Sequence, residues 1–243
     1  MSKDRDFATS LRTGPYRDSN LAKLVKLCLA TKHPDDVFFS DFEPDEASEG
    51  EPTQYLASPI VDGSEPLGVF ALQLSSAAID DVMTGRRGWQ RDGLGDTGQS
   101  LLVGADFLLR SDFRSFLTDP QGFLKSLKTY GFDQEKINKI RLYKTTILQI
   151  QAKLPSTTAA LNGQEGTIIE SSILGNRLNL TSYMPLHIEG LHWAIASRMS
   201  LEEALQPVSE MKRLFSWWGA ALFVLTLSAA WLTTHQILRR STL

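Results

Sequence analysis

The chain has 243 residues, which is enough for one large domain or two small ones with a hydrophobic core. Its 25 Lys and Arg residues are outnumbered by 28 Asp and Glu residues, and the net charge of −3 argues against a nucleic-acid-binding protein, in which basic residues normally prevail. Cys28 is the single cysteine, so an intramolecular disulfide and a CxxC metal site are excluded.

The first third of the chain predicts a capped helix, a strand hairpin and a second capped helix. Asp18 and Ser19 are candidate N-caps of the first helix. The apolar positions of this helix are Leu21, Leu24, Val25, Leu27 and Cys28. The later elements are a short strand at 37–39, an acidic loop at 41–52, strands at 54–61 and 67–74, and a serine-capped helix at 75–83.

A second set of strands and helices is predicted after Trp89. The stretches QSLLVGA (99–105) and FLLRSD (107–112) favour a second hairpin, and residues 119–161 are expected to be mostly helical. Three further strands are predicted at 167–174, 177–186 and 191–199. Because neighbouring strands follow one another directly, apart from one helical insertion, the pattern predicts an α+β fold with antiparallel sheets rather than a parallel sheet.

The C-terminal residues predict a transmembrane helix. Residues 214–232 carry no charged side chain, and as a helix they would span about 28 Å, close to the hydrocarbon thickness of a bilayer. Trp217, Trp218 and Trp231 lie toward its two ends, as is typical of side chains at membrane interfaces. A buried core helix is the alternative. Basic pairs flank the segment on both sides, so the positive-inside rule leaves its orientation open.

A further helix is expected to lead into this segment. Ser200 and Glu203 have the S-x-x-E spacing of a capping box, and Pro207 is expected to kink the helix. At the other end of the chain, MSKDRDFATS is polar and charged and predicts no signal peptide. A chain with only a C-terminal anchor would ordinarily leave its soluble part in the cytoplasm.

Gly93, Gly95 and Gly98 have the G-x-G-x-x-G spacing of a dinucleotide-binding loop. Such a loop follows a strand and opens a helix, so that the pyrophosphate lies at the helix N-terminus. Here GWQRD precedes the glycines and the strand-like QSLLVGA follows them, so the context is inverted. No Walker-type GK[ST] follows either. The glycines therefore favour a turn with positive φ before an edge strand.

Two groups of residues have features of metal sites. Acidic residues of the 41–52 stretch have the spacing of calcium-loop ligands, but Glu46 and Pro52 stand where that loop needs glycine and glutamate, which favours a solvated loop. His187 and His192 flank a predicted turn and are expected to form a structural pair, with zinc binding as the alternative. The sequence contains neither a G-x-S-x-G elbow nor a Cys/His arrangement of nucleophilic type.

Three phrases of the sequence are similar to those of a known family. They are YLASPIVDGSEPLGVFALQLSSAAIDDVMT (55–84), GLGDTGQSLLVGADFLLRSDFR (93–114) and YMPLHIEGLHWAIA (183–196). They resemble the extracytoplasmic double Cache (PAS-like) sensor region of bacterial transmembrane receptors. The likeness is greatest to receptors with a HAMP region and an adenylate/guanylate cyclase output, and relatives occur on histidine kinases and chemoreceptors. It covers about residues 10–238.

The resemblance implies two PAS-like antiparallel-sheet domains, the first incomplete, followed by one transmembrane helix. The implied parts are a membrane-distal domain (1–86), a membrane-proximal domain (87–200), a juxtamembrane helix (201–212), the transmembrane helix (213–234) and a cytoplasmic stub (235–243). A first transmembrane helix upstream and a HAMP and output region downstream would complete such a receptor. The sensor region would lie outside the cell membrane, in a homodimer, and bind an unknown small molecule. No cofactor, nucleic acid or catalytic residue is expected in this chain.

The family's membrane-distal pockets for amino acids have an Arg-x-Trp-Tyr helix, a tyrosine and an aspartate. This sequence departs from that set, because SNLAKLVKLC lacks the helix residues, Asp45 replaces an aromatic residue and Gln73 replaces the aspartate. A structural ion pair or hairpin cap is the alternative role for two of the candidates, Arg110 and Asp112. Two other hypotheses are a membrane-anchored metal-dependent enzyme and a degenerate remnant without a ligand. The ligand-binding residues we predict are Asp41, Tyr55, Gln73, Arg110 and Asp112.

Overall fold

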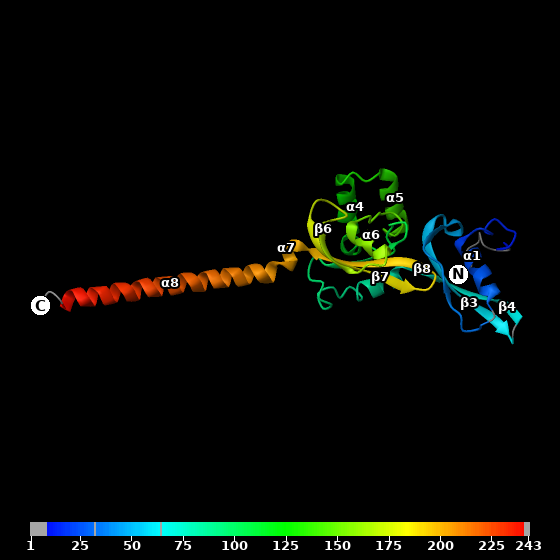
Figure 1. Ribbon diagram of the computed structural model, residues 1–243. Coiled ribbons are helices and arrows are strands. Elements are labelled where there is room, and N and C mark those ends of the chain that lie inside the picture. The colour runs from blue at the N-terminus through cyan, green and yellow to red at the C-terminus, as the bar shows by residue number, and fades with distance from the viewer. Residues whose placement is uncertain (1–8, 32, 64, 241–243) are drawn as a thin grey trace. The chain divides into compact units, whose positions relative to one another are not determined.

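The computed structural model describes the backbone of residues 9–31, 33–63 and 65–240, and the side chains of these ranges up to Trp231. The chain divides into two compact units, Met1–Ser200 and Leu201–Leu243. The first unit combines helices with antiparallel sheets, which confirms the α+β class (Figure 1). Most of the predicted polar N-terminus and the end of the predicted stub lie outside the described residues.

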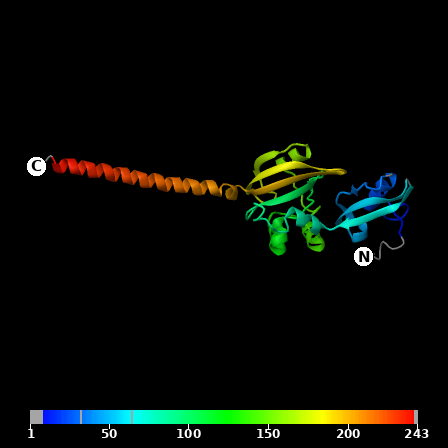
Figure 2. The same cartoon turned by 90° about the horizontal axis from the view of Figure 1, so that it is seen from below.

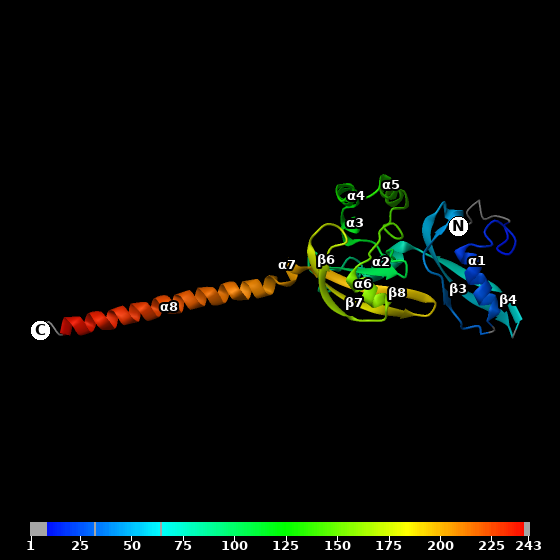
Figure 3. The same ribbon diagram turned by 45° about the horizontal axis from the view of Figure 1, so that its top comes forward.

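The first four strands form the N-terminal sheet, with β3 (Glu51–Asp62) at its centre. β3 pairs antiparallel with β1 (Phe38–Phe39), β2 (Glu43–Asp45) and β4 (Glu65–Leu74), which confirms the predicted hairpin. Helix α1 (Asn20–Ala30) packs along the β3–β4 hairpin (Figure 3). The buried core between them comprises Leu24, Cys28, Tyr55 and Ala57.

Two expectations for this region are wrong. The acidic stretch 41–52 is no plain loop, because it contains β2, a short 3-10 helix (Glu46–Ser48) and the start of β3, whose backbone offers β2 a pairing partner. Leu27 does not belong to the buried face of α1 and is 55% exposed. That face follows Leu24 and Cys28, which are one helical turn apart, and Leu27 lies at its edge.

Both predicted serine caps are confirmed. Ser19 Oγ accepts a hydrogen bond from the backbone N–H of Ala22, and Ser75 Oγ accepts one from Ala77, each at 3.2 Å. These bonds satisfy N–H groups that have no partner within the first turn of a helix. The helix that Ser75 begins, α2 (Ser76–Met83), follows β4 directly in the chain.

The remaining strands form the C-terminal sheet, in the order β5-β8-β7-β6 and antiparallel throughout. Their bounds are β5 (Gln99–Gly104), β6 (Gly166–Ser171), β7 (Leu178–Ile188) and β8 (Leu191–Ser200). The last three are the successive strands that the sequence predicts. Figure 2 shows β7 and β8 in yellow tones, separate from the β3–β4 hairpin in cyan.

Four short helices between β5 and β6 build the core of this sheet. They are α3 (Arg114–Thr118), α4 (Pro120–Thr129), α5 (Gln134–Tyr143) and α6 (Pro155–Leu161). Figure 1 shows α4 and α5 side by side, and α6 packs against β6, β7 and β8. Leu101 and Val103 of β5 face this core, because alternate residues of a strand share a face. Their buried partners include Leu109, Phe113, Phe123, Leu127, Ile137, Ile140 and Ile150.

Residues 107–112 fold back on β5 as the predicted hairpin, but they also bond to a distant segment. The backbone N–H of Arg110 donates to the carbonyl of Leu102 at 2.8 Å, and that of Gly104 donates to the carbonyl of Leu108 at 3.0 Å. Residues 107–112 form isolated bridges and no strand, and residues 144–154 interrupt the region expected to be helical. The backbone N–H of Leu109 donates to the carbonyl of Ile150, and that of Leu148 donates to the carbonyl of Leu109, each at 3.1 Å. Leu109 thus forms a bridge with Val103 of β5 and also bonds residues 148 and 150, so the backbone of 144–154 is held by a distant segment instead of by helical hydrogen bonds.

The second unit consists of α7 (Leu201–Ala204) and α8 (Gln206–Arg240). The helix is interrupted at Leu205, two residues before Pro207, whose nitrogen cannot donate a hydrogen bond to the carbonyl of Glu203. Within Gln206–Trp231 the most apolar 18-residue stretch has a mean hydropathy of 1.5, and none of that stretch is buried. In the described part of the chain α8 is the one helix long and apolar enough to cross a membrane.

Candidate functional site

The glycine-rich residues 93–98 form a turn rather than a phosphate-binding loop. They lie in a succession of turns, and β5 follows them directly, so the inverted context inferred from the sequence is confirmed. Gly95 has a φ of +54°, a region that favours glycine. The carbonyl oxygens of Gly95 and Gly98 accept hydrogen bonds from Arg114 Nη1 at 2.9 and 2.7 Å. A phosphate cradle presents backbone N–H groups to an anion, whereas these turns present carbonyl groups to a cation.

Asp41 and Arg110, two of the predicted ligand residues, form an ion pair across 69 residues of sequence. Arg110 Nε lies 2.7 Å from Asp41 Oδ1 and Nη2 lies 2.9 Å from Oδ2, so both carboxylate oxygens are engaged. The Arg110 side chain is 3% exposed and that of Asp41 is 33% exposed. Such two-point pairing is the strongest form of arginine–carboxylate contact.

Other side chains complete this pair. Asp41 Oδ1 also accepts from Trp193 Nε1 at 2.8 Å, and Arg110 Nη1 lies 3.0 Å from Asp106 Oδ1. Burial lowers the pKa of Arg110, but the hydrogen bonds that it donates to Asp41 and Asp106 outweigh burial and raise it. Arg110 therefore forms a structural ion pair, which is the alternative to a ligand-binding role. The partners of Arg110 are Asp41 and Asp106 rather than Asp112.

Gly104 lies against the Arg110 guanidinium, where a Cβ atom would overlap Cζ and Nη2. We expect Gly104→Ala to lower the free energy of unfolding by about 1–2 kcal/mol, because Arg110 is held by two carboxylates and cannot give way freely. The matched control is Gly68→Ala, also in a strand, where a Cβ atom would meet open space. Denaturant unfolding of the full chain in detergent measures both variants. Equal effects would show that Gly104 does not make room for Arg110.

Asp112 belongs to a second buried cluster, together with Asp80 of α2. The backbone N–H of Asp112 donates to Asp80 Oδ1 at 2.7 Å. Asp112 Oδ1 accepts from Thr145 Oγ1 at 3.0 Å, from Thr146 Oγ1 at 2.5 Å and from the backbone N–H of Thr146. These donors come from the protein itself, so Asp112 connects α2 with residues 145–146.

Asp80 is the more unusual member of this cluster. Its pKa is raised to about 8, first because burial disfavours the charged form and then because the negative charge of Asp112 lies close. Sequence reasoning missed Asp80, which stands beside the exposed Asp81 in SSAAIDDVM. Only the packing of α2 shows which of the two adjacent carboxylates is buried.

Tyr55 and Gln73 lie in two separate hollows, although they are paired across β3 and β4. Tyr55 lines a hollow of about 260 Å³ together with Asp45 and residues around the start of α1. Gln73 is exposed and lines a hollow of about 210 Å³ next to Ser75. Of the five predicted residues, the structure therefore brings together only Asp41 and Arg110. A ligand-binding role for any of the five stays a prediction.

Two of the side chains considered for metal binding, His192 and Glu43, contact other protein groups. His187 and His192 are paired across β7 and β8, and His192 Nε2 lies 2.9 Å from the carbonyl oxygen of Leu161. Glu43 of the acidic stretch forms an exposed ion pair with Lys23 at 3.1 Å. Within residues 9–31, 33–63 and 65–231, no three His, Cys, Asp or Glu side chains are grouped so that they could hold a metal ion.

A hollow of about 350 Å³ opens between the C-terminal sheet and helices α3 and α4. Its floor includes Gln99 of β5, Asn179 of β7 and Arg198 of β8, and its walls include Phe123 of α4 and the loop 172–177. We call it the Arg198 hollow. It joins side chains from three strands, two helices and a loop, so only the tertiary structure brings them together.

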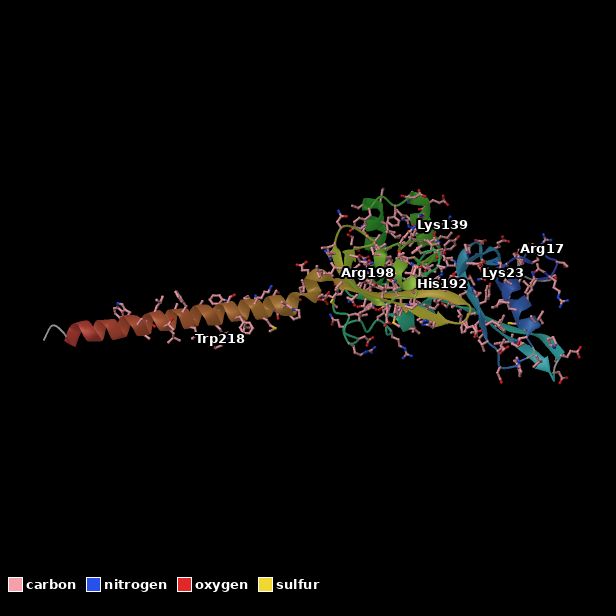
Figure 4. All side chains as sticks on the ribbon, in the orientation of Figure 1. Arg17, Lys23, Lys139, His192, Arg198 and Trp218 are labelled. Carbon is pink, nitrogen blue, oxygen red and sulfur yellow. The ribbon has the colours of Figure 1, made fainter. Side chains whose placement is uncertain are left out.

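Arg198 is the charged centre of this hollow. It extends from β8, where Figure 4 labels it, and is only 5% exposed. Its Nη2 donates to Ser172 Oγ at 2.8 Å. Burial lowers the pKa of Arg198 to about 10, and the negative charge of Glu170 partly opposes this. A buried cation that loses this much solvation is unusual outside a site where it has a role.

Sequence reasoning missed Arg198, although one feature of the sequence indicates it. In LHWAIASRM, alternate residues share a face of the strand, so Arg198 has the same orientation as Ala194 and Ala196. Both alanines are fully buried or nearly so. An arginine in series with buried alanines predicts a charged group on the core face of the sheet.

No protein-family model and no curated protein matches the chain. It is similar to the ligand-binding domain of the Pseudomonas fluorescens chemoreceptor CtaA in complex with L-serine, with 13% identity, 80% of this chain and 63% of that chain covered, and a TM-score of 0.41. It is also similar to the ligand-binding domain of the Pseudomonas aeruginosa PAO1 amino acid chemoreceptor PctB in complex with L-Arg. The identity is 15%, 84% of this chain and 67% of that chain are covered, and the TM-score is 0.46.

Both solved structures are ligand-binding domains of sensory receptors. The chain spans about three fifths of the length of the first of them. At these identities the similarity concerns the fold alone.

Proposed function

We propose that this chain is the extracytoplasmic sensing region of a bacterial membrane receptor, together with the helix that crosses the membrane. The observation that carries the proposal is the continuity of β8 with the helical unit. β8 supplies Arg198 and Ser200 to the Arg198 hollow, and α7 begins at the next residue, Leu201. A small molecule that binds this hollow acts on the strand that precedes the apolar helix.

The parts of the receptor follow the family resemblance of the sequence. Residues 1–86 would belong to a membrane-distal domain, and residues 87–200 would form the membrane-proximal domain. Residues 201–212 would be the juxtamembrane helix, and residues 213–234 would be the transmembrane helix. The length and apolar composition of α8 support this assignment. We further propose that the receptor is a homodimer whose output is a cyclase coupled through a HAMP region.

Binding changes the output only if the ligand has different affinities for two conformations of the receptor. A displacement of β8 by the ligand would be passed along the chain to α7 and α8. Shifts of this kind are typically one or two ångströms at helices that carry signals.

A ligand screen on the full chain tests this function. The chain is reconstituted in lipid nanodiscs, and its thermal unfolding is followed by tryptophan fluorescence with amino acids, organic acids, amines and sugars. We expect at least one class to raise the unfolding temperature saturably, since a ligand at a hundred times its Kd stabilises the native state by about 2.7 kcal/mol. If compounds of every class leave the unfolding temperature unchanged, the sensing function is wrong.

A further inference from the structure

We propose that the Arg198 hollow binds a small organic monocarboxylate, whose carboxylate group is held by Arg198 and Asn179. This inference rests on the proposed sensing function and specifies its ligand. It places the binding site on the C-terminal sheet, in a hollow that none of the five predicted ligand-binding residues lines.

The first argument is the unused hydrogen-bonding capacity of Arg198. A guanidinium has five N–H donors in a fixed planar arrangement. Among the described residues, Arg198 makes one side-chain hydrogen bond, to Ser172. Guanidinium donors without a protein partner are normally satisfied by water or by a ligand. The remaining donors match the two oxygens of a carboxylate.

The second argument is an independent donor in the same hollow. Asn179 is 7% exposed, and its amide Nδ2 has no hydrogen-bond partner among the described residues. Asn179 pairs with Ser200 and Thr181 pairs with Arg198 across β7 and β8, so these side chains share one face of the sheet. Thr181 Oγ1 is likewise buried and unpartnered in the described part of the chain.

The third argument is the charge of the surroundings. Glu170 lies near enough to Arg198 to affect its pKa, but its two oxygens accept hydrogen bonds from the Ser156 backbone N–H and Oγ at 3.1 and 2.6 Å. The described residues place no carboxylate within ion-pair distance of Arg198. Arg198 is the buried cation among the residues that line the hollow, and Arg177 lines it too but is exposed to solvent. The buried cation matches one negative charge on the ligand, and a second negative charge close to Arg198 would be repelled by Glu170.

The fourth argument is the size and lining of the hollow. About 350 Å³ is room for a small organic molecule and lies within the range of small-molecule sites in proteins. Phe113, Phe123 and Leu174 line it beside the polar groups. These side chains offer apolar contact to the organic part of a carboxylate, which inorganic anions lack.

The test is a titration of the full chain in nanodiscs with acetate, propionate and benzoate, with the matched amides and inorganic phosphate as comparison. Thermal unfolding and calorimetry measure binding. We expect a monocarboxylate to bind saturably, its neutral amide to bind at least tenfold more weakly, and Arg198→Gln to weaken the carboxylate at least tenfold. Arg141→Gln, which removes the same charge from an exposed position of α5, is expected to leave binding unchanged.

A second variant keeps the test independent of the folding of Arg198→Gln. Asn179→Asp keeps the size of the side chain but places a negative charge beside the ligand, so carboxylate binding should be lost. If Arg198 has only a structural role, Arg198→Gln will unfold at a lower temperature than the original chain without ligand. Asn179→Asp will then bind the carboxylate as tightly as the original chain does.

The outcomes separate this inference from the proposed function. Equal binding of carboxylates and amides, binding of phosphate alone, or equal effects of Arg198→Gln and Arg141→Gln would each overturn the monocarboxylate site. If only amines or neutral compounds stabilise the chain, the inference fails while the sensing function stands. If no compound of any class binds, both fail.

Discussion

Replacing Asp41 with alanine is expected to lower the free energy of unfolding by about 3–4 kcal/mol, because breaking a buried ion pair leaves the remaining charge without compensation. Four hydrogen bonds would be lost, two from Arg110 and one each from Trp193 Nε1 and the Phe42 backbone N–H. Arg110 would keep Asp106, whose side chain is 46% exposed and therefore a weaker partner. Denaturant unfolding of the full chain in detergent measures the change.

The matched control for this variant is Glu135→Ala. Glu135 forms an ion pair of 2.8 Å with Lys139, but both side chains are largely exposed. Exposed pairs contribute about 0–1 kcal/mol, so this variant should be close to the original chain. A loss of stability in Asp41→Ala no larger than in Glu135→Ala would show that the Asp41–Arg110 pair does not stabilise the fold.

The stability of the chain is expected to fall by about 2–3 kcal/mol between pH 6 and pH 8, because of the buried carboxyl group of Asp80. The pKa of Asp80 is raised from 3.8 to about 8 in the folded chain. Between these values the folded state keeps a proton that the unfolded state has released. Raising the pH therefore favours the unfolded state, and the effect ends above the folded pKa.

Two variants assign this pH dependence to its residue. Asp80→Asn keeps an oxygen that can accept from the Asp112 backbone N–H but cannot titrate, so its stability should change little from pH 6 to pH 8. Asp81→Asn changes the exposed neighbour and should keep the dependence. Thermal unfolding at several pH values measures both variants. A slope that persists in Asp80→Asn would assign the titration to other groups.

The ion pair and the carboxyl cluster have a common consequence. Asp41 lies next to the N-terminal sheet and binds Arg110 and Trp193 of the C-terminal sheet region, and Phe42 stacks on Trp193 with ring centroids 6.3 Å apart. Asp80 of α2 binds the backbone of Asp112. These contacts hold the parts of the first unit together.

Local patterns determine much of the fold. The β3–β4 hairpin, the three strands from β6 to β8, the serine caps at Ser19 and Ser75, and the long apolar helix α8 follow from alternation, turn residues, capping residues and composition. Each of these features depends on residues within about one element of each other. The glycine turn at 93–98, which precedes a strand instead of following one, likewise depends only on neighbouring residues.

Long-range contacts decide the rest. Residues 144–154 depart from the predicted helix because their backbone groups bond to residues 107–109, which also fold back on β5 as predicted. The partner of Arg110 is Asp41, which is 69 residues away, and not Asp112, which is two residues away. Spacing in the sequence cannot show which carboxylate a buried arginine reaches.

The sequence by itself determined the α+β class, the order of most strands and the apolar C-terminal helix, because periodicity and turn chemistry act over a few residues. Only the tertiary structure decided where the candidate site lies. Arg198, Asn179 and Ser172 come from β8, β7 and the loop before β7, and the packing of α4 over the sheet closes the hollow around them. A buried donor is recognised as unsatisfied only when every group that could reach it has been placed, and that is a property of the folded chain.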